Sequence, residues 1–534
     1  MMEKKIFIKI LVATVTLVLL IKFVTTIFIE PWIGSKIRSE LNNEDRNYII
    51  ETDKVKISLI RSAVELTDVT IYSRQQHEGV RDFSGEIASV KLTGINLARA
   101  ILKHDIYIRK VTFSNGIING KFPFSGRAGH PVVSPLSLGI GRILFDQLNM
   151  ELEDDSTGQT YSVKDAMLKV YDFQVGMTDT ILPGTIKLFD FKAGELSMVS
   201  SDKMYSYVVR GINYPANLNT LFIDSLFVRP NYANYDFTSR YAFQTNRIEA
   251  AFTGIYIYDF DTEDYLRSMS LKSPYIEIGQ MDMKVFRDKR KEFRHVNKLA
   301  FQDFLYDFPH NFLIDSIILL KGNVTFTVHA EEANEPGVVR FNEINASLYK
   351  LTNDTSYKTE KGFMEIKADA LLMGKGKMAV FLKERIFDSN NTFSLEGSLA
   401  GLNVIELNPI LEKSAFFYAT SGQIDAMNFS FSADNEKATG KMIMLYHGLD
   451  IAVKNRKTDD TTAFRERFVS YIANRRIPDS NPGKGEDVRE GTIDYVRDPE
   501  RSVFHYCFRS VLSGITSTLA DGNKKMEERL AGLK

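Results

Sequence analysis

Few residues in this sequence have the types and spacing that catalysis or cofactor binding requires. Residues 374–377 read GKGK, without the spacing or the hydroxyl of a GxxxxGK[ST] phosphate loop, and GIG at 139–141 lacks a third glycine. GxSxG, HExxH and CxxC motifs are absent from the sequence. We therefore expect no enzymatic activity, no catalytic residues, no cofactor and no metal site.

The remaining reactive side chains are interpreted as structural. His329 stands near Glu331 and Glu332, and we expect all three to be solvated residues at a strand end. Cys507, the single cysteine, lies on an expected amphipathic helix and is expected to act as a small buried apolar side chain. One cysteine also excludes an intramolecular disulfide.

Composition narrows the class of protein. The chain has 534 residues, with 67 Lys+Arg against 68 Asp+Glu, so its net charge of -1 gives no strong field for nucleic acid. Its 37 Phe and 23 Tyr favour strands over helical bundles. We expect a mainly β protein that does not bind nucleic acid.

Residues 6–29, IFIKILVATVTLVLLIKFVTTIFI, predict a transmembrane anchor after a cytoplasmic tip at 1–5. Lys9 can reach the headgroups from near one end, whereas Lys22 costs about 2.5–3.5 kcal/mol, which the aliphatic side chains outweigh. A cleaved signal peptide is the alternative, but residues 28–31 make a poor cleavage site. Basic residues before the span favour a cytoplasmic N-terminus and a translocated bulk.

The rest of the chain divides into regions that differ in composition and hydrophobic periodicity. Residues 30–53 predict a helical stalk, and 54–360 predict a repeated β-sheet region with period-two alternation. Residues 361–455 predict a second β region, interrupted by a short helix at 404–414. Residues 456–534 predict a charged loop and C-terminal helices at 462–474 and 503–519.

A strand pattern recurs in the first β region: LGIGRILF at 138–145, LFIDSLFV at 221–228 and FLIDSIIL at 312–319. Two turn-tolerant residues separate the apolar pairs of each copy. Because side chains alternate between the two faces of a strand, the three-residue step from Ile223 to Leu226 would place these two side chains on opposite faces. Either a bulge or bend restores one apolar face there, or the strand crosses between two packed layers. The irregular spacing of the copies suits a long sheet with variable loops.

The order of these features resembles the AsmA-like family. Residues 64–73 (VELTDVTIYS) and 87–120 (IASVKLTGINLARAIL and the following residues) are similar to its N-terminal region. Residues 407–451, which begin LNPILEKS, and 481–515, which begin NPGKGEDVRE, are similar to its C-terminal region.

The resemblance implies a protein anchored in a bacterial inner membrane, with its bulk in the periplasm. It implies an elongated, curved, groove-like β-sheet related to chorein-type lipid-bridge proteins, which holds phospholipid or another membrane lipid and serves outer-membrane lipid homeostasis and envelope biogenesis. The groove residues would then be the apolar positions of the repeat: Leu138, Ile140, Ile143, Phe145, Leu221, Ile223, Leu226, Val228, Phe312, Ile314, Ile317 and Leu319.

Two alternatives stay open. The repeated aliphatic side chains could form an ordinary protein core, since any sheet with an apolar face must cover it with protein or lipid. The β region could also be a structural scaffold or assembly factor that binds an envelope protein partner.

Overall fold

The computed structural model describes residues 48–519 except 59–61, 75, 78–79, 82, 96–104, 123–136, 155–156, 176–187, 309, 356–361, 416 and 454–477. The protein is mainly β, as predicted, with 19 of the described strands assigned to one sheet. The chain divides into two compact units. Unit 1 contains the described residues of Met1–Asn231 and Phe252–Pro274, and unit 2 those of Tyr232–Ala251 and Tyr275–Lys534.

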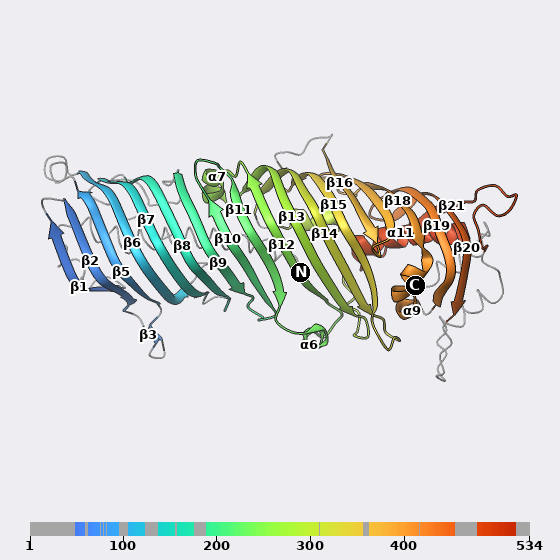
Figure 1. The fold of residues 1–534 in the computed structure, drawn as a ribbon, viewed down its shortest axis with the longest axis horizontal. Helices are drawn as coiled ribbons and strands as arrows, with labels where there is room; N and C mark the ends of the chain where they lie inside the picture. Colours follow the sequence, from blue (N-terminus) through green and yellow to red (C-terminus); the bar gives the residue numbers. More distant parts are fainter. Residues whose placement is uncertain are drawn as a thin grey trace. The chain divides into compact units, whose positions relative to one another are not determined.

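Unit 1 is built from long strands (Figure 1, blue to green). Neighbours pair antiparallel along β1, β2, β5 and β6, then β6 pairs parallel with β7, and antiparallel pairing resumes through β11. The strands are β1 (Tyr48–Ser58), β2 (Ala63–Ser73), β5 (Phe83–Ile95), β6 (Asp105–Phe122), β7 (Ser137–Asp154), β8 (Thr160–Val175), β9 (Leu188–Val199), β10 (Tyr205–Tyr214) and β11 (Leu221–Pro230), with a separate ribbon of β3 (Gln76–His77) and β4 (Val80–Arg81).

Unit 2 contains an antiparallel meander from β14 to β21 (Figure 1, yellow to red). Its strands are β14 (Phe312–His329), β15 (Gly337–Thr352), β16 (Phe363–Leu372), β17 (Gly376–Arg385), β18 (Phe393–Asn403), β19 (Phe417–Ala433), β20 (Lys437–Val453) and β21 (Glu490–Val496). Strands β12 (Asn246–Tyr258) and β13 (Leu271–Asp288) contribute residues to each unit.

Short helices connect the strands. Helix α7 (Thr262–Ser268) belongs to unit 1, and unit 2 holds α6 (Asn234–Ser239), α8 (Phe301–Tyr306), η4 (Val404–Leu407), α9 (Asn408–Ser414) and α11 (Val503–Leu519). The predicted helices at 404–414 and 503–519 are confirmed, the first as η4 followed by α9. Among the described residues, no helix is long and apolar enough to cross a membrane.

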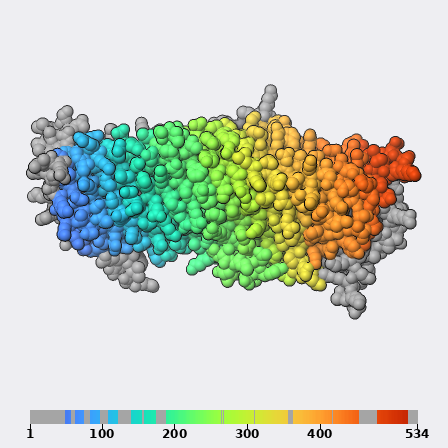
Figure 2. Space-filling model, in the orientation of Figure 1, coloured from blue at the N-terminus to red at the C-terminus, as the bar shows by residue number. Residues whose placement is uncertain are grey.

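Alternation decides which side chains enter the core of unit 1. On β2 and β5 almost every second residue is buried, as for Leu66 and Val90, which are 2% and 1% exposed. Between β6 and β7 the rings of Phe113 and Phe145 stack with centroids 4.6 Å apart. Side chains fill the spaces between the ribbons of neighbouring strands (Figure 2).

The repeated strands share a backbone feature at their central residue pair. The first of the two central residues of each copy lies opposite a residue of positive φ on the antiparallel neighbour. Gly211 (φ 62°) lies between the pairs Arg210↔Ser225 and Ile212↔Ile223. Asp172 on β8 (φ 50°) and Lys350 on β15 (φ 58°) occupy the corresponding positions opposite the other two copies.

The register continues unchanged past these left-handed residues, so each acts without the inserted residue of a bulge. Gly211 also leaves room for its neighbour, because a Cβ there would lie 2.6 Å from the Cβ of Asp224. Ile140 and Ile143, on either side of the central pair of β7, are both buried. On β7 the apolar residues on both sides of the central pair therefore lie in the core, whereas Leu226 of β11 and Ile317 of β14 are only half-buried.

The structure corrects several sequence-based boundaries and does not describe some of the predicted segments. Residues 48–53 of the predicted 30–53 stalk are strand, because Ile50 pairs with Ile71 and both are buried in the sheet. Residues 490–496, predicted within a loop-and-helix region, form β21, and the short helices α6, α7 and α8 were not predicted. The tip at 1–5, the anchor at 6–29, the stalk at 30–47 and the helix at 462–474 lie outside the described residues. The proposed boundary at 360/361 falls inside unit 2.

Candidate functional site

The repeat residues of unit 1 that were groove candidates are mostly enclosed by protein. Ile140, Ile143, Phe145, Ile223 and Val228 are 2–4% exposed. Leu221 and Leu226 are half-buried, and the side chain of Leu138 is outside the described set. These positions therefore contribute to the folded core of unit 1.

Unit 2 differs, because one face of its sheet is apolar and only half-buried. We call this surface the apolar face of unit 2. Residues directly opposite each other in an antiparallel pair share a face, and the pairs Val324↔Phe341, Phe326↔Val339 and Leu348↔Ile366 all combine half-buried apolar residues. The face extends over β13 to β16 and includes Met281, Met283, Val285, Ile317, Ile344 and Ala368.

Gly322 locates β13 relative to this face. A Cβ on Gly322 would lie 2.9 Å from Cδ2 of Leu319 and 3.2 Å from both the Cβ of Ile344 and the Cε of Met281. The methionine of β13 therefore packs beside the apolar residues of β14 and β15. Three groove candidates on β14, namely Phe312, Ile314 and Leu319, are 4%, 0% and 7% exposed, whereas Ile317 remains half-buried.

Helix α11 covers another part of the sheet. Its buried residues Tyr506, Ser510, Gly514 and Thr518 recur every four positions and so form one stripe. The absence of a side chain at Gly514 allows close contact, since a Cβ there would lie 2.8 Å from Cγ1 of Ile493. The resulting core joins β18–β21 to α11, and Leu372 of β16 packs against it. The apolar-face residues Phe326, Phe341 and Leu348 are not members of this core.

A buried carboxyl group lies at one end of β17. Glu384 of β17 lies opposite Met364 of β16 in the strand register, and its side chain is 3% exposed. Burial raises its pKa to about 7, and a hydrogen bond to Gln302 opposes this rise. Burial also raises the pKa of the nearby Cys507 thiol to about 12, as suits a packed thiol rather than a nucleophile.

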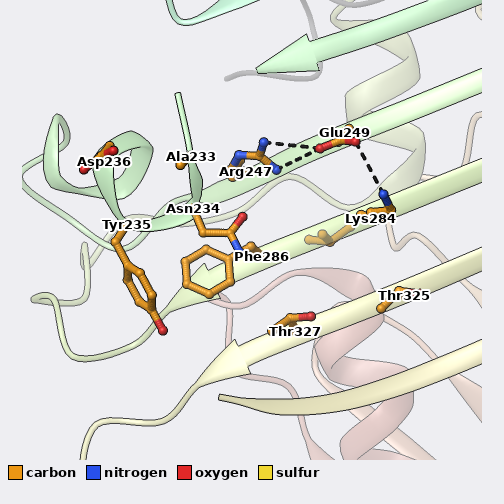
Figure 3. Close-up of a pocket in the computed structure, with 11 residues that line it drawn as sticks. Ala233, Asn234, Tyr235, Asp236, Arg247, Glu249, Lys284, Phe286, Thr325 and Thr327 are labelled. Atoms are coloured by element: carbon orange, nitrogen blue, oxygen red, sulfur yellow. Dashed lines mark hydrogen bonds and ion pairs between the residues drawn. The ribbon is translucent and has the colours of Figure 1, made fainter. Parts of the chain in front are cut away.

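A pocket of about 550 Å³ lies on the opposite, polar face of unit 2, beside α6 (Figure 3). Lys284 and Thr325 point to this face because they alternate with Val285 and Val324. Glu249 accepts hydrogen bonds from Arg247 at 3.2 Å and lies 3.6 Å from the Lys284 ammonium. The basic side chains of the pocket are thus already engaged, and we assign it no ligand.

His329 corrects one sequence-based interpretation. It is 3% exposed rather than solvated, although Glu331 and Glu332 are exposed as expected. Its Nδ1 lies 2.8 Å from the hydroxyl of Tyr235, and its Nε2 lies 2.8 Å from the carbonyl oxygen of Ala333. The imidazole therefore ties α6 to the end of β14, a tertiary contact that local polarity does not reveal.

Comparison with protein-family models and with curated proteins gives no match to this chain. Functional inference therefore depends on the described faces of unit 2. Sequence reasoning missed the half-buried part of β15 and β16 as a candidate site, because the repeat template was the criterion. The alternation of Val339, Phe341 and Ile344, with its three-residue step, was the available signal.

Proposed function

We propose that this protein binds lipid through the apolar face of unit 2 and contributes to the transfer of lipid between membranes. The half-buried apolar residues of β13–β16 are the observation that carries this proposal. Each Å² of apolar surface removed from water is worth about 25 cal/mol. Acyl chains on this face would bury the apolar surface that the protein itself leaves accessible to solvent.

The setting of the proposed activity comes from the sequence. An anchor at 6–29 would hold the protein on an inner membrane with its bulk in the periplasm, as the AsmA-like resemblance implies. Lipid held on the apolar face would then serve outer-membrane lipid homeostasis without any enzymatic step. Unit 1, whose described repeat residues are mostly buried, would act mainly as a packed scaffold.

Adjacent residues of β14 provide a matched test. Phe326 lies on the apolar face and Thr327 on the polar face, and both are half-buried. A photoactivatable amino acid at 326 in the membrane-embedded full-length protein should capture phospholipid, whereas the same group at 327 should not. Mass spectrometry of the crosslinked species identifies what is captured.

Variants extend the test to bound lipid. Phe326→Asp should remove co-purifying lipid from the detergent-solubilised protein, and Thr327→Asp should retain it. Equal capture from both positions, or a wild-type protein without lipid, would refute lipid binding on this face. Capture of polypeptide alone at 326 would support the scaffold alternative instead.

A further inference from the structure

Five basic side chains gather where the end of β13 and the segment after it meet the start of α11 and the residues just before it. We call Arg287, Lys289, Arg501, His505 and Arg509 the basic cluster. The two segments are in contact, because the Lys298 N–H donates to the Pro499 carbonyl at 2.8 Å and the Arg501 guanidinium lies 3.6 Å from the centre of the Phe293 ring.

These contacts bring the basic side chains of the two segments toward one another, and their like charges repel. Burial, followed by repulsion from Arg501 and Arg509, lowers the pKa of His505 to about 4. Burial and then the charges of Arg287, Arg501 and Arg509 lower the pKa of Lys289, although this side chain remains exposed. The ammonium of Lys289 therefore carries a charge that the neighbouring basic side chains disfavour.

Within the described ranges, few acidic groups compensate this positive charge. Asp498 lies 3.5 Å from Arg501, and Glu500 pairs with His295 outside the cluster. In the part of the chain that the structure describes, no carboxylate forms an ion pair with Arg287, Lys289 or Arg509. Arg287 donates one hydrogen bond, to Gln244 at 3.2 Å, and Arg509 faces the ring of Tyr495.

Two buried nitrogen atoms of the cluster, Nε of Arg287 and Nδ1 of His505, have no hydrogen-bond partner among the described residues. Leaving a buried polar atom unpaired is costly, and arginine guanidinium groups are well suited to bind phosphate through charge-assisted hydrogen bonds. The cluster therefore combines excess positive charge with unused hydrogen-bonding capacity.

The cluster adjoins the apolar face of unit 2. Arg287 is two residues beyond Val285 on β13, so their side chains share a face of the sheet. Arg287, Arg501, His505 and Arg509 are all half-buried and keep access to solvent. A ligand with acyl chains on the apolar face could thus place a charged group against these residues.

We propose that the basic cluster binds the phosphate group of a phospholipid whose acyl chains lie on the apolar face of unit 2. This proposal rests on the proposed lipid binding and specifies its ligand class. An anionic phospholipid suits the cluster best, because its charge offsets the repulsion among the side chains. Free phosphate shares the recognised chemistry but lacks the acyl chains.

The test compares ligands that differ by one group, using the full-length protein in detergent. Phosphatidylglycerol, diacylglycerol with the same acyl chains, and inorganic phosphate are titrated, with affinity and thermal midpoint as readouts. We expect phosphatidylglycerol to bind at least about tenfold more tightly than diacylglycerol, as charge-assisted hydrogen bonds predict. Inorganic phosphate should bind more weakly than phosphatidylglycerol because it cannot occupy the apolar face.

The double variant Arg287→Gln, Arg509→Gln should lose about tenfold or more in phosphatidylglycerol affinity and keep its diacylglycerol affinity. Lys284→Gln, on the polar face of β13, is the matched control and should leave both affinities unchanged. The double variant should also keep or raise the thermal midpoint without lipid, because two mutually repelling charges are removed.

Each contrary result has a separate meaning. Equal affinity of the wild-type protein for the two lipids, or an unchanged double variant, overturns the phosphate site and leaves lipid binding intact. Binding of inorganic phosphate but of neither lipid overturns the phospholipid assignment. Failure of every ligand to bind overturns both this proposal and the proposed function.

Discussion

Replacing Glu384 by glutamine removes a carboxyl group that the fold buries at a cost. Glu384 is 3% exposed, and burial, with a smaller contribution from Asp303, raises its pKa to about 7. Glutamine has nearly the same shape and can still accept the hydrogen bond from Gln302. The substitution should therefore stabilise the folded protein wherever the wild-type carboxyl would be ionised in the unfolded chain.

The sign and size follow from proton linkage. The unfolded chain releases this proton near pH 4.5 and the folded protein only near pH 7, so the stability present below pH 4.5 is lost as pH rises to 7. A pKa raised from 4.5 to about 7 corresponds to about 3 kcal/mol above pH 7. At about 2 °C per kcal/mol, the thermal midpoint of Glu384→Gln should exceed that of the wild type by roughly 6 °C at pH 8.

Calorimetry of the full-length protein in detergent at pH 4.5 and pH 8 measures both midpoints. The difference between Glu384→Gln and wild type should be small at pH 4.5 and large at pH 8. Glu396→Gln, at an exposed position of β18, is the control and should shift neither midpoint appreciably. The reasoning is refuted if Glu384→Gln is no more stable than wild type at pH 8, or is shifted equally at both values.

Two further predictions concern packing and reactivity. Gly440→Ala should lower the free energy of unfolding by about 1–3 kcal/mol or more, because its Cβ would lie 2.1 Å from the backbone oxygen of Ser430. Gly85→Ala, whose nearest neighbour would be 3.5 Å away, should be far milder in the same unfolding experiment. Cys507 is half-buried and its thiol pKa is raised to about 12, so it should react with a maleimide at pH 8 much more slowly in the folded than in the denatured protein; equal rates would contradict this expectation.

Local pattern predicted most of the strands and two of the helices. Alternating Val, Leu and Ile residues mark β2, and the apolar spacing of residues 503–519 marks α11. Both patterns involve residues that are close together in the sequence, so they can be recognised without the tertiary structure.

The errors fall where distant residues decide. Strand β21 reads EGTIDYV, with few apolar residues, and it is a strand because β20 pairs with it and α11 packs on Ile493. The six residues of α6 are too short to be stable alone. Phe237 within α6 is 0% exposed, which shows that tertiary packing supports the helix.

The candidate site likewise depends on residues that are distant from one another in the sequence. The basic cluster brings Arg287 together with Arg501 and Arg509, which are more than 200 positions away along the chain, so no local motif could indicate it. Its unpaired nitrogen atoms are also a property of the folded protein alone.

The amino-acid sequence by itself determined that this protein is mainly β, that its strands carry apolar faces, and that three strands reverse face at a central residue pair. Only the tertiary structure decided which apolar residues remain accessible: Ile314 and Val324 are both aliphatic residues of β14, yet one is 0% exposed and the other half-buried. Alternation depends on neighbouring residues along a strand, whereas coverage depends on whatever the rest of the chain packs against that face. A prediction of lipid binding from alternation therefore becomes specific only when the uncovered part of the sheet is known.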